Sequence, residues 1–152
     1  MRRKDKEIDD ILLIEQILAT AQVCRLAMSL NDEPYVVPMN FGYKDRGLYF
    51  HCAREGKKID ILKRNNRVCF EVETHTGIIK SGKPCNWGMK YMSVIGYGKV
   101  SFINDSNEKI EALKIILNQY YKGEFDFTDA DIDKIDVFKV DIESMTGKKS
   151  GY

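Results

Sequence analysis

The sequence of 152 residues has almost no excess of charge of either sign, because 24 lysines and arginines are balanced by 23 aspartates and glutamates. A formal net charge of +1 gives no overall attraction toward nucleic acid or an anionic membrane, so any positive surface must be local. Long apolar runs are missing too, since Asp9, Asp10 and Glu15 interrupt the apolar stretch near the N-terminus and exclude a signal-peptide core or membrane span there. We expect no nucleic-acid or membrane partner and a cytoplasmic location.

Motifs for metal sites and hydrolytic chemistry are also absent. Cys24, Cys52, Cys69 and Cys85 form no C-x-x-C pair, which disfavours zinc and a redox dithiol. The chain has only two histidines, and His51 has no second ligand at metal-binding spacing, so we expect no metal site. The sequence contains no G-x-G-x-x-G, P-loop, G-x-S-x-G or H-E-x-x-H motif. A bound cofactor then becomes the natural source of reactivity.

The pattern of apolar residues predicts a mainly β (α+β) fold, a six-stranded antiparallel barrel with flanking helices, as one domain over residues 1–152. The expected strands are residues 23–30, 35–43, 48–53, 67–74, 91–103 and 137–143. The expected helices are residues 8–18, 57–65 and 104–121, with a short helix in 127–135. Residues 75–88, which include an exposed His75, are expected as a loop, and 144–152 as a polar, mobile tail.

Two features within these strands carry positional information. Pro38 lacks a backbone donor, so its strand is expected at a sheet edge or with a bulge, where a ligand can approach the main chain. Gly96 and Gly98 are two residues apart and face the same side, which permits bending or close packing of the backbone.

A basic segment stands where a strand gives way to a helix. Gly56 is followed by Lys57 and Lys58 in the first helical turn, where acidic residues are normally favoured. A phosphate bound at the start of the helix would turn this cost into a gain. The residues alone leave open whether this is a phosphate site or a solvated basic turn.

The roles of His51 and Trp87 are also open from the residues alone. If the strand alternates, Tyr49 and His51 share one face, and His51 is a core histidine, a metal ligand or a group facing a cofactor. Trp87, the only tryptophan, lies beside glycine, methionine and tyrosine. That composition suits a subunit interface, stacking on a flat ring, or a plug at the end of the barrel.

Several segments together resemble the flavin-binding split-barrel family related to pyridoxamine phosphate oxidases, and most of all its 5-nitroimidazole-resistance branch. These segments run nearly end to end and in order: MRRKDKEI, CRLAM, PYVVPMNFGY, LYFHCAREGKKIDIL, VCFEVE, CNWGMKYMSVIGYGKV, EKIEAL and MTGKK. The resemblance implies an FMN-binding split barrel that forms a homodimer with two FMN sites between its subunits.

The same resemblance assigns roles by position. Residues Pro38, Met39 and Asn40 would lie along the isoalloxazine ring. His51 would stand beside the flavin, and Lys57 and Lys58, with backbone near Ala53, would hold the phosphate. The partner subunit would contribute Trp87, Tyr91 and Ser93.

The implied activity is FMN-dependent reduction of a nitroimidazole or another small aromatic or nitro substrate, with His51 as proton donor or substrate anchor. The alternative is a flavin- or haem-binding module that does not turn over nitro compounds, and FAD, a deazaflavin or haem are alternative cofactors. A third reading, a nucleic-acid-binding barrel, conflicts with the near-zero net charge.

Overall fold

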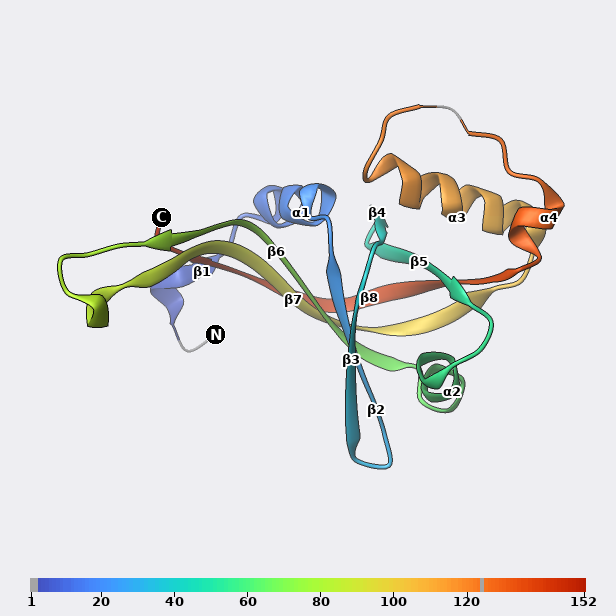
Figure 1. Ribbon diagram of the computed structural model, residues 1–152, viewed down its shortest axis with the longest axis horizontal. Coiled ribbons are helices and arrows are strands. Elements are labelled where there is room, and N and C mark those ends of the chain that lie inside the picture. Colours follow the sequence, from blue (N-terminus) through green and yellow to red (C-terminus); the bar gives the residue numbers. More distant parts are fainter. Residues whose placement is uncertain (1–2, 124) are drawn as a thin grey trace.

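The computed structural model describes residues 3–123 and 125–152, and its centre is one antiparallel sheet of eight strands (Figure 1). The six long strands correspond to the six predicted ones. They are β2 (Cys24–Leu30), β3 (Glu33–Met39), β5 (Gly47–Ala53), β6 (Arg67–Ile79), β7 (Gly88–Ile103) and β8 (Ile135–Ser150). The sequence pattern does not separate two short strands. β1 (Glu7–Ile8) overlaps the start of the helix expected over residues 8–18, and β4 (Gly42–Lys44) overlaps the end of the strand expected over residues 35–43, which breaks after Met39.

Two hairpins are closed by two-residue turns with left-handed backbone. Asn31 and Asp32 have φ values of 52° and 63° between β2 and β3, and Asp45 and Arg46 have 48° and 58° between β4 and β5. Two consecutive positive φ angles match the right-handed twist of the flanking strands. The predicted tight reversals at these two places are confirmed.

The sheet is an open, split barrel. Its strands follow the order β3-β2-β6-β7-β8-β5-β4, and β1 pairs with β8. Over the part of the chain that the structure describes, the end strands β3 and β4 do not pair with each other. Pro38 therefore lies on an edge strand, as predicted, and pairs only with Arg25 of β2. The predicted split-barrel fold is confirmed.

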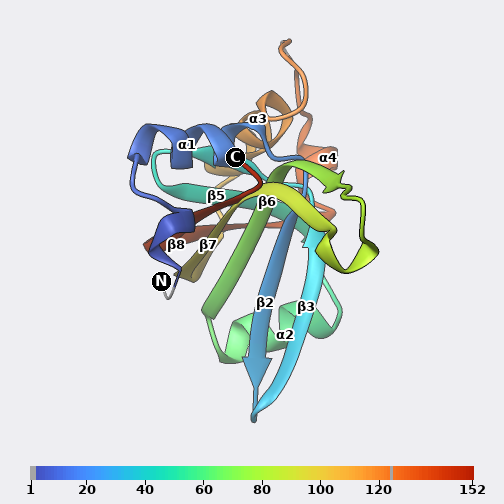
Figure 2. The ribbon, with the colours of Figure 1, turned by 90° about the vertical axis from the view of Figure 1, so that its left-hand side faces the viewer.

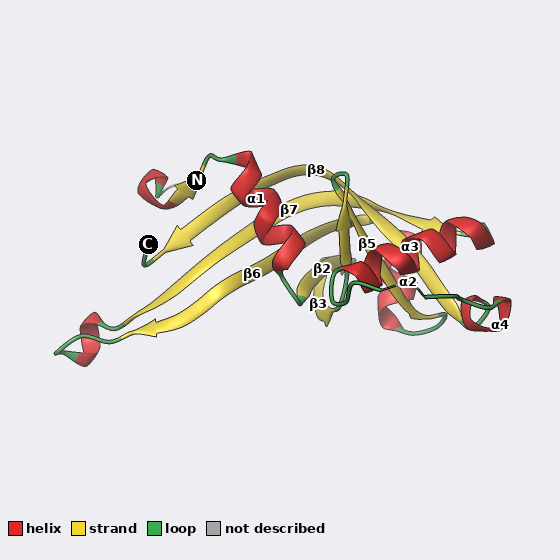
Figure 3. Ribbon diagram, turned by 90° about the horizontal axis from the view of Figure 1, so that it is seen from above, coloured by secondary structure: helices red, strands yellow, loops and turns green. Residues whose placement is uncertain are grey.

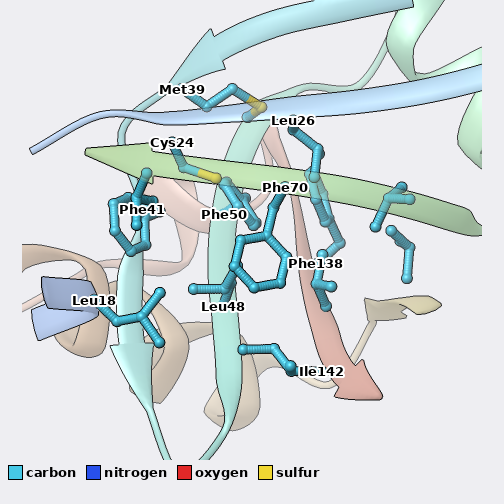
Figure 4. Close-up of a cluster of buried hydrophobic side chains, with 14 of the residues drawn as sticks. Leu18, Cys24, Leu26, Met39, Phe41, Leu48, Phe50, Phe70, Phe138 and Ile142 are labelled. Carbon is cyan, nitrogen blue, oxygen red and sulfur yellow. The ribbon is translucent and has the colours of Figure 1, made fainter. Parts of the chain in front are cut away.

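Aromatic side chains fill the interior of the barrel (Figure 4). Phe41, Phe50, Phe70 and Phe138 are all fully buried. The rings of Phe50 and Phe138 stack with centroids 5.1 Å apart, and Phe41 lies 6.2 Å from Phe50. Alternation along β5 therefore sends Phe50 into this core and His51 to the opposite face.

The helices cover the ends and edges of the sheet. They are α1 (Ile11–Thr20), α2 (Lys57–Arg64), α3 (Ser106–Asn118) and α4 (Asp129–Ile132), with 3-10 turns η1 (Lys4–Lys6) and η2 (Pro84–Asn86). A second, smaller core lies where α3 and α4 meet the outer face of the sheet, and contains Leu113, Ile116 and Val137.

The first helix differs from its prediction. It begins at Ile11 because the side chain of Asp10 caps it and accepts a hydrogen bond from the Leu12 N–H at 2.9 Å. Ile14, Ile17 and Leu18 form its buried face, whereas Ile11 and Leu12 are exposed. The apolar spacing of Ile11 and Leu12 relative to Leu18 predicts that they lie on the buried face of the helix, and that prediction is wrong.

Two segments expected without regular structure extend the sheet instead. Strand β6 continues to Ile79, and strand β7 already begins at Gly88. Only residues 80–87 therefore form the predicted loop. Residues 144–150 are not a loose tail but the end of β8, where Ser150 pairs with Tyr91 of β7. We call residues 74–92 and 144–152 the arm, which reaches away from α3 and α4 (Figures 1 and 3).

Candidate functional site

The turn between β5 and α2 places a free helix start next to a strand end. Gly56 precedes the helix with φ 120° and ψ 165°, a conformation that residues with a Cβ rarely adopt. The N–H groups of the first helical turn have no partner within the helix, and no side chain caps them. These donors and the positive end of the helix dipole create a place for an anion.

Lys57 is held beside the edge strand. Its ammonium lies 2.7 Å from Oε1 of Glu33 and 4.9 Å from the centre of the Tyr35 ring. The hydrogen bond with Glu33 raises the pKa of Lys57, so the side chain stays positively charged. Figure 2 shows α2 beside the lower part of β2 and β3, and Glu33 and Tyr35 both belong to β3. These two contacts could not be expected from the sequence, since Glu33 and Tyr35 precede Lys57 by more than twenty residues.

His51 is half-buried, on the opposite face of β5 from Phe50. Its Nδ1 atom is buried and has no hydrogen-bond partner among the residues that the structure describes. Burial lowers the pKa of His51 below its ordinary value, and the positive charge of Lys58 lowers it further. The imidazole is therefore neutral near pH 7, and a buried polar atom without a partner is expected where a ligand completes the site.

An apolar cavity of about 280 Å³ lies next to His51. It is enclosed by β5, the C-terminal half of α3, and the segment that runs through α4 into β8. The lining residues are His51, Leu113, Ile116, Leu117, Phe127, Asp131 and Ile135. A mainly apolar wall with a few polar groups is typical of pockets for small organic molecules.

The three residues predicted to lie along a flavin ring are at the end of β3. Pro38 and Asn40 are exposed at the sheet edge, whereas the side chain of Met39 is only 8% exposed and belongs to the core. A ligand at this edge can therefore meet the side chains of Pro38 and Asn40 but only the backbone of Met39.

Trp87, Tyr91 and Ser93 lie on or next to the arm and not beside His51. The ring of Trp87 is 46% exposed, and its Nε1 donates to the carbonyl of Ser81 at 2.9 Å. Tyr91 is half-buried with the Lys148 ammonium 5.5 Å from its ring centre, and Ser93 is buried. Within one chain the arm and the end of the molecule that carries α3 lie far apart along the long axis (Figure 1).

Sequence reasoning also missed the groups that fix this end of the molecule. Arg54 donates to the carbonyl of Asp133 at 2.7 Å and lies 3.8 Å from the Asp136 carboxylate. It thereby ties the β5–α2 turn to the segment after α4. The many acidic residues around Asp133 and Asp136 were the available signal for a basic partner. The pairing of Arg54 with them depends on the register between β5 and β8, which the sequence pattern does not show.

The cysteines take no part in the site. All four are free, and Cys24 and Cys52 are buried. Burial raises the pKa of Cys24 to about 12 and also raises the pKa of Cys52. Both thiols therefore stay protonated near pH 7 and pack as small apolar groups.

Comparison with known proteins agrees with this fold. Residues 13–149 match the model of the pyridoxamine 5'-phosphate oxidase family. No curated protein matches the sequence. None of the helices in the described part of the chain is long and apolar enough to cross a membrane.

Three solved structures illustrate the range of relatives. A Bacteroides thetaiotaomicron protein described as a 5-nitroimidazole antibiotic resistance protein shares 40% identity over 94% of this chain and 86% of that one, with a TM-score of 0.84. An FAD and haem binding protein from Mycobacterium smegmatis shares 16% identity over 97% and 74%, with a TM-score of 0.86. An FAD-binding protein from Mesorhizobium loti shares 23% identity over 93% and 96%, with a TM-score of 0.70.

Proposed function

Because the chain belongs to the pyridoxamine 5'-phosphate oxidase family, we propose that it is an FMN-dependent oxidoreductase that reduces small nitro-aromatic compounds such as nitroimidazoles. The observation that carries this proposal is the β5–α2 turn. It brings an uncapped helix start, the Lys58 charge and the unpartnered Nδ1 of His51 together within eight residues. The relative with 40% identity supports the choice of substrate class.

The residues at this turn fit the cofactor. Lys57, Lys58 and the backbone that follows Ala53 would hold the phosphate through charge and N–H donors. Pro38 and Asn40, exposed at the edge of β3, would lie along the ring system. When bound, FMN supplies the electrons for the reduction.

His51 would act as an anchor for the substrate. Its lowered pKa keeps the imidazole neutral near pH 7, so it presents a hydrogen-bonding group and not a permanent positive charge. The apolar wall formed by Leu113, Ile116 and Phe127 would exclude water from the same space and receive a flat ring. Of the two roles considered for His51, we therefore favour anchoring over proton donation.

The proposal includes a homodimer and a cytoplasmic location. The arm, which contains Trp87 and Tyr91, and the end of the molecule that carries α3 lie far apart along the long axis (Figure 1). A second copy would bring Trp87, Tyr91 and Ser93 to the site. The four free cysteines are consistent with a reducing compartment.

The second candidate is a flavin- or haem-binding module without turnover. The neutral His51 beside an apolar cavity is what favours it, because a neutral imidazole is also a good ligand for haem iron. The alternatives to FMN as the bound flavin are FAD and a deazaflavin.

An absorbance spectrum of the freshly purified protein separates these candidates. Flavin bands, together with anaerobic loss of the nitro absorbance when a reductant and a nitroimidazole are added, would support the reductase. A haem band, or flavin without turnover, would support the second candidate. FMN at a hundredfold excess over Kd should raise the free energy of unfolding by about 2.7 kcal/mol. A colourless protein whose free energy of unfolding does not rise when FMN is added would contradict both candidates.

Two histidine variants test the anchoring role. His51→Ala should keep the flavin bands but lose most of the nitroimidazole reduction, through a raised KM. His75→Ala, which changes the only other histidine, serves as the matched control and should leave both properties unchanged. Loss of the flavin itself in His51→Ala would assign this residue to cofactor binding.

A further inference from the structure

The cavity beside His51 has a negative charge in its lining and no positive one. Among the lining residues in the described part of the chain, Asp131 is the only one with a carboxylate, and none is a lysine or an arginine. His51 adds no charge near pH 7, because burial lowers the pKa of its imidazole. The other lining side chains are apolar. A ligand in this cavity therefore meets a wall whose one formal charge is negative.

The carboxylate of Asp131 is held in place by the residue that precedes α4. Its Oδ2 atom accepts hydrogen bonds from the Thr128 hydroxyl at 2.7 Å and from the Thr128 N–H at 3.0 Å. These two hydrogen bonds lower the pKa of Asp131, and the charge of Lys134 lowers it further, so the group is ionised near pH 7. Its Oδ1 atom accepts no hydrogen bond from the residues that the structure describes. This oxygen is available to a ligand.

The segment that carries Asp131 adds to the negative potential. Residues 119–136 contain six acidic residues and two lysines, a formal charge of −4 in a chain whose net charge is +1. Arg54 fastens this segment beside the site through its hydrogen bond to the carbonyl of Asp133, and the Asp136 carboxylate 3.8 Å away offsets the charge of Arg54. Charges of one sign around a concave, apolar wall attract ligands of the opposite charge.

Positive charge is found at the other end of the site, at the start of α2. Lys58 is close enough to lower the pKa of His51. In the proposed function the phosphate of the cofactor offsets this charge, so Lys58 does not repel a positive substrate. The two ends of the cavity then differ in kind, because His51 offers a neutral hydrogen-bonding group and Asp131 offers a negative one.

We propose that Asp131 is a specificity-determining residue that selects aromatic substrates with a positively charged amino group and rejects those with a carboxylate. The ring would lie against Leu113, Ile116 and Phe127, and the amino group would donate to Oδ1 of Asp131. A hydrogen bond between two charged groups is roughly twice as strong as a neutral one, and the same carboxylate repels an anion.

A neutral ring meets neither effect and should bind with intermediate affinity. This inference rests on the proposed function, which assigns the cavity to the substrate, and it narrows the class of nitro-aromatic compounds that the site would take.

Three ligands of similar size and different charge test the proposal by binding alone. At pH 7 benzylamine is positive, benzyl alcohol is neutral and benzoate is negative. Isothermal titration of the purified protein, with FMN added, measures the Kd of each. We expect the wild-type chain to bind benzylamine at least about fivefold more tightly than benzoate, with benzyl alcohol between them.

Two variants of Asp131 and one control locate the effect. Asp131→Asn removes the charge but keeps the size and an oxygen that can accept from Thr128, so it should abolish the difference between benzylamine and benzoate. Asp131→Lys should reverse the order of these two ligands, a gain that an unfolded variant could not show. The control, Asp126→Asn, removes an exposed carboxylate from the same segment but outside the cavity lining, and should keep the wild-type order.

The order of the three affinities decides the outcome. An order that persists in Asp131→Asn, or that is lost equally in Asp126→Asn, would show that the charge of the whole segment selects the ligand and would overturn the proposal. Equal binding of the three ligands by the wild type, or no binding of any, would also overturn it.

The 4-nitro derivatives of the same ligands report on the proposed function separately. Charge-ordered binding without reduction of any derivative would refute only the reductase. Reduction of all three with equal KM would refute only the role of Asp131.

Discussion

Strand β7 passes through two different environments between Gly88 and Ile103. From Ser93 onward, Val94 and Val100 are buried, and Gly96 lies close to the ring of Phe70 and the carbonyl of Ser144. Before Ser93, in the arm, Met89 is 50% exposed although β7 still pairs with β6 there. One face of β7 in the body of the barrel thus buries its apolar groups within the chain, whereas in the arm Met89 and Trp87 are exposed. The difference teaches that apolar residues on one strand can be core residues at one end and surface residues at the other.

The largest expected contrast is between two aromatic residues. Phe50→Ala removes a fully buried ring that stacks on Phe138, and should lower the free energy of unfolding by about 3–5 kcal/mol. Trp87→Ala removes a larger ring from the exposed arm and should change the free energy of unfolding of the monomer by less than about 0.5 kcal/mol. Urea denaturation at low protein concentration measures both. Equal losses would show that the arm is part of the folding core.

Two glycines of β7 sharpen the comparison. A Cβ at Gly96 would strike the ring of Phe70 and lie 2.7 Å from the carbonyl oxygen of Ser144, so Gly96→Ala should cost about 1–3 kcal/mol through overpacking. A Cβ at Gly88 would meet nothing within 4 Å, so Gly88→Ala should leave stability unchanged or slightly raised. Thermal unfolding of the two variants side by side checks this. A stable Gly96→Ala variant would contradict the close packing described here.

The smallest expected effect concerns pH. The pKa of His51 is lowered in the folded state from its ordinary value of 6.5, so the unfolded chain binds more protons there as the solution is acidified. The free energy of unfolding therefore decreases as the pH falls below about 6.5, and the stability associated with a neutral His51 is fully present above that value. His51→Gln should flatten the decline in stability between about pH 7 and pH 5.5, which urea denaturation at several pH values can measure.

The other histidine supplies the control for that measurement. His75 is exposed and has a left-handed backbone, with φ 55°, so His75→Asn keeps a residue that tolerates this conformation. We expect its pH dependence to match that of the wild type. The same flattening in both variants would show that the effect does not come from burial at His51.

Local patterns predict the body of this molecule well. The turn at Asn31 and Asp32, the edge position of Pro38 and the helix start after Gly56 all follow from residue types whose backbone preferences act over a few positions. The alternation along β5 likewise predicts that Tyr49 and His51 share a face. These features needed no knowledge of which strand lies beside which.

The arm could not be predicted in the same way. His75 has a positive φ, and the pairing of β6 with β7 shifts register between Thr74 and Gly77, so the alternation breaks where the strand continues. The end of β8 is polar because much of it stays accessible, so its composition predicts a tail. The cavity beside His51 could not be predicted for a different reason, since Leu113 of α3 and Phe127 of the segment before α4 meet there only through tertiary packing.

The most direct test of the account compares two ligands that differ by one phosphate. Isothermal titration with FMN and riboflavin should be carried out on Lys57→Gln with Lys58→Gln, and on Lys63→Gln as the control at the other end of α2. We predict that the double variant binds FMN at least about tenfold more weakly while riboflavin affinity stays unchanged, and that the control binds both as the wild type does. An equal loss for the two ligands, or no loss for FMN, would contradict the claim that the start of α2 holds the phosphate.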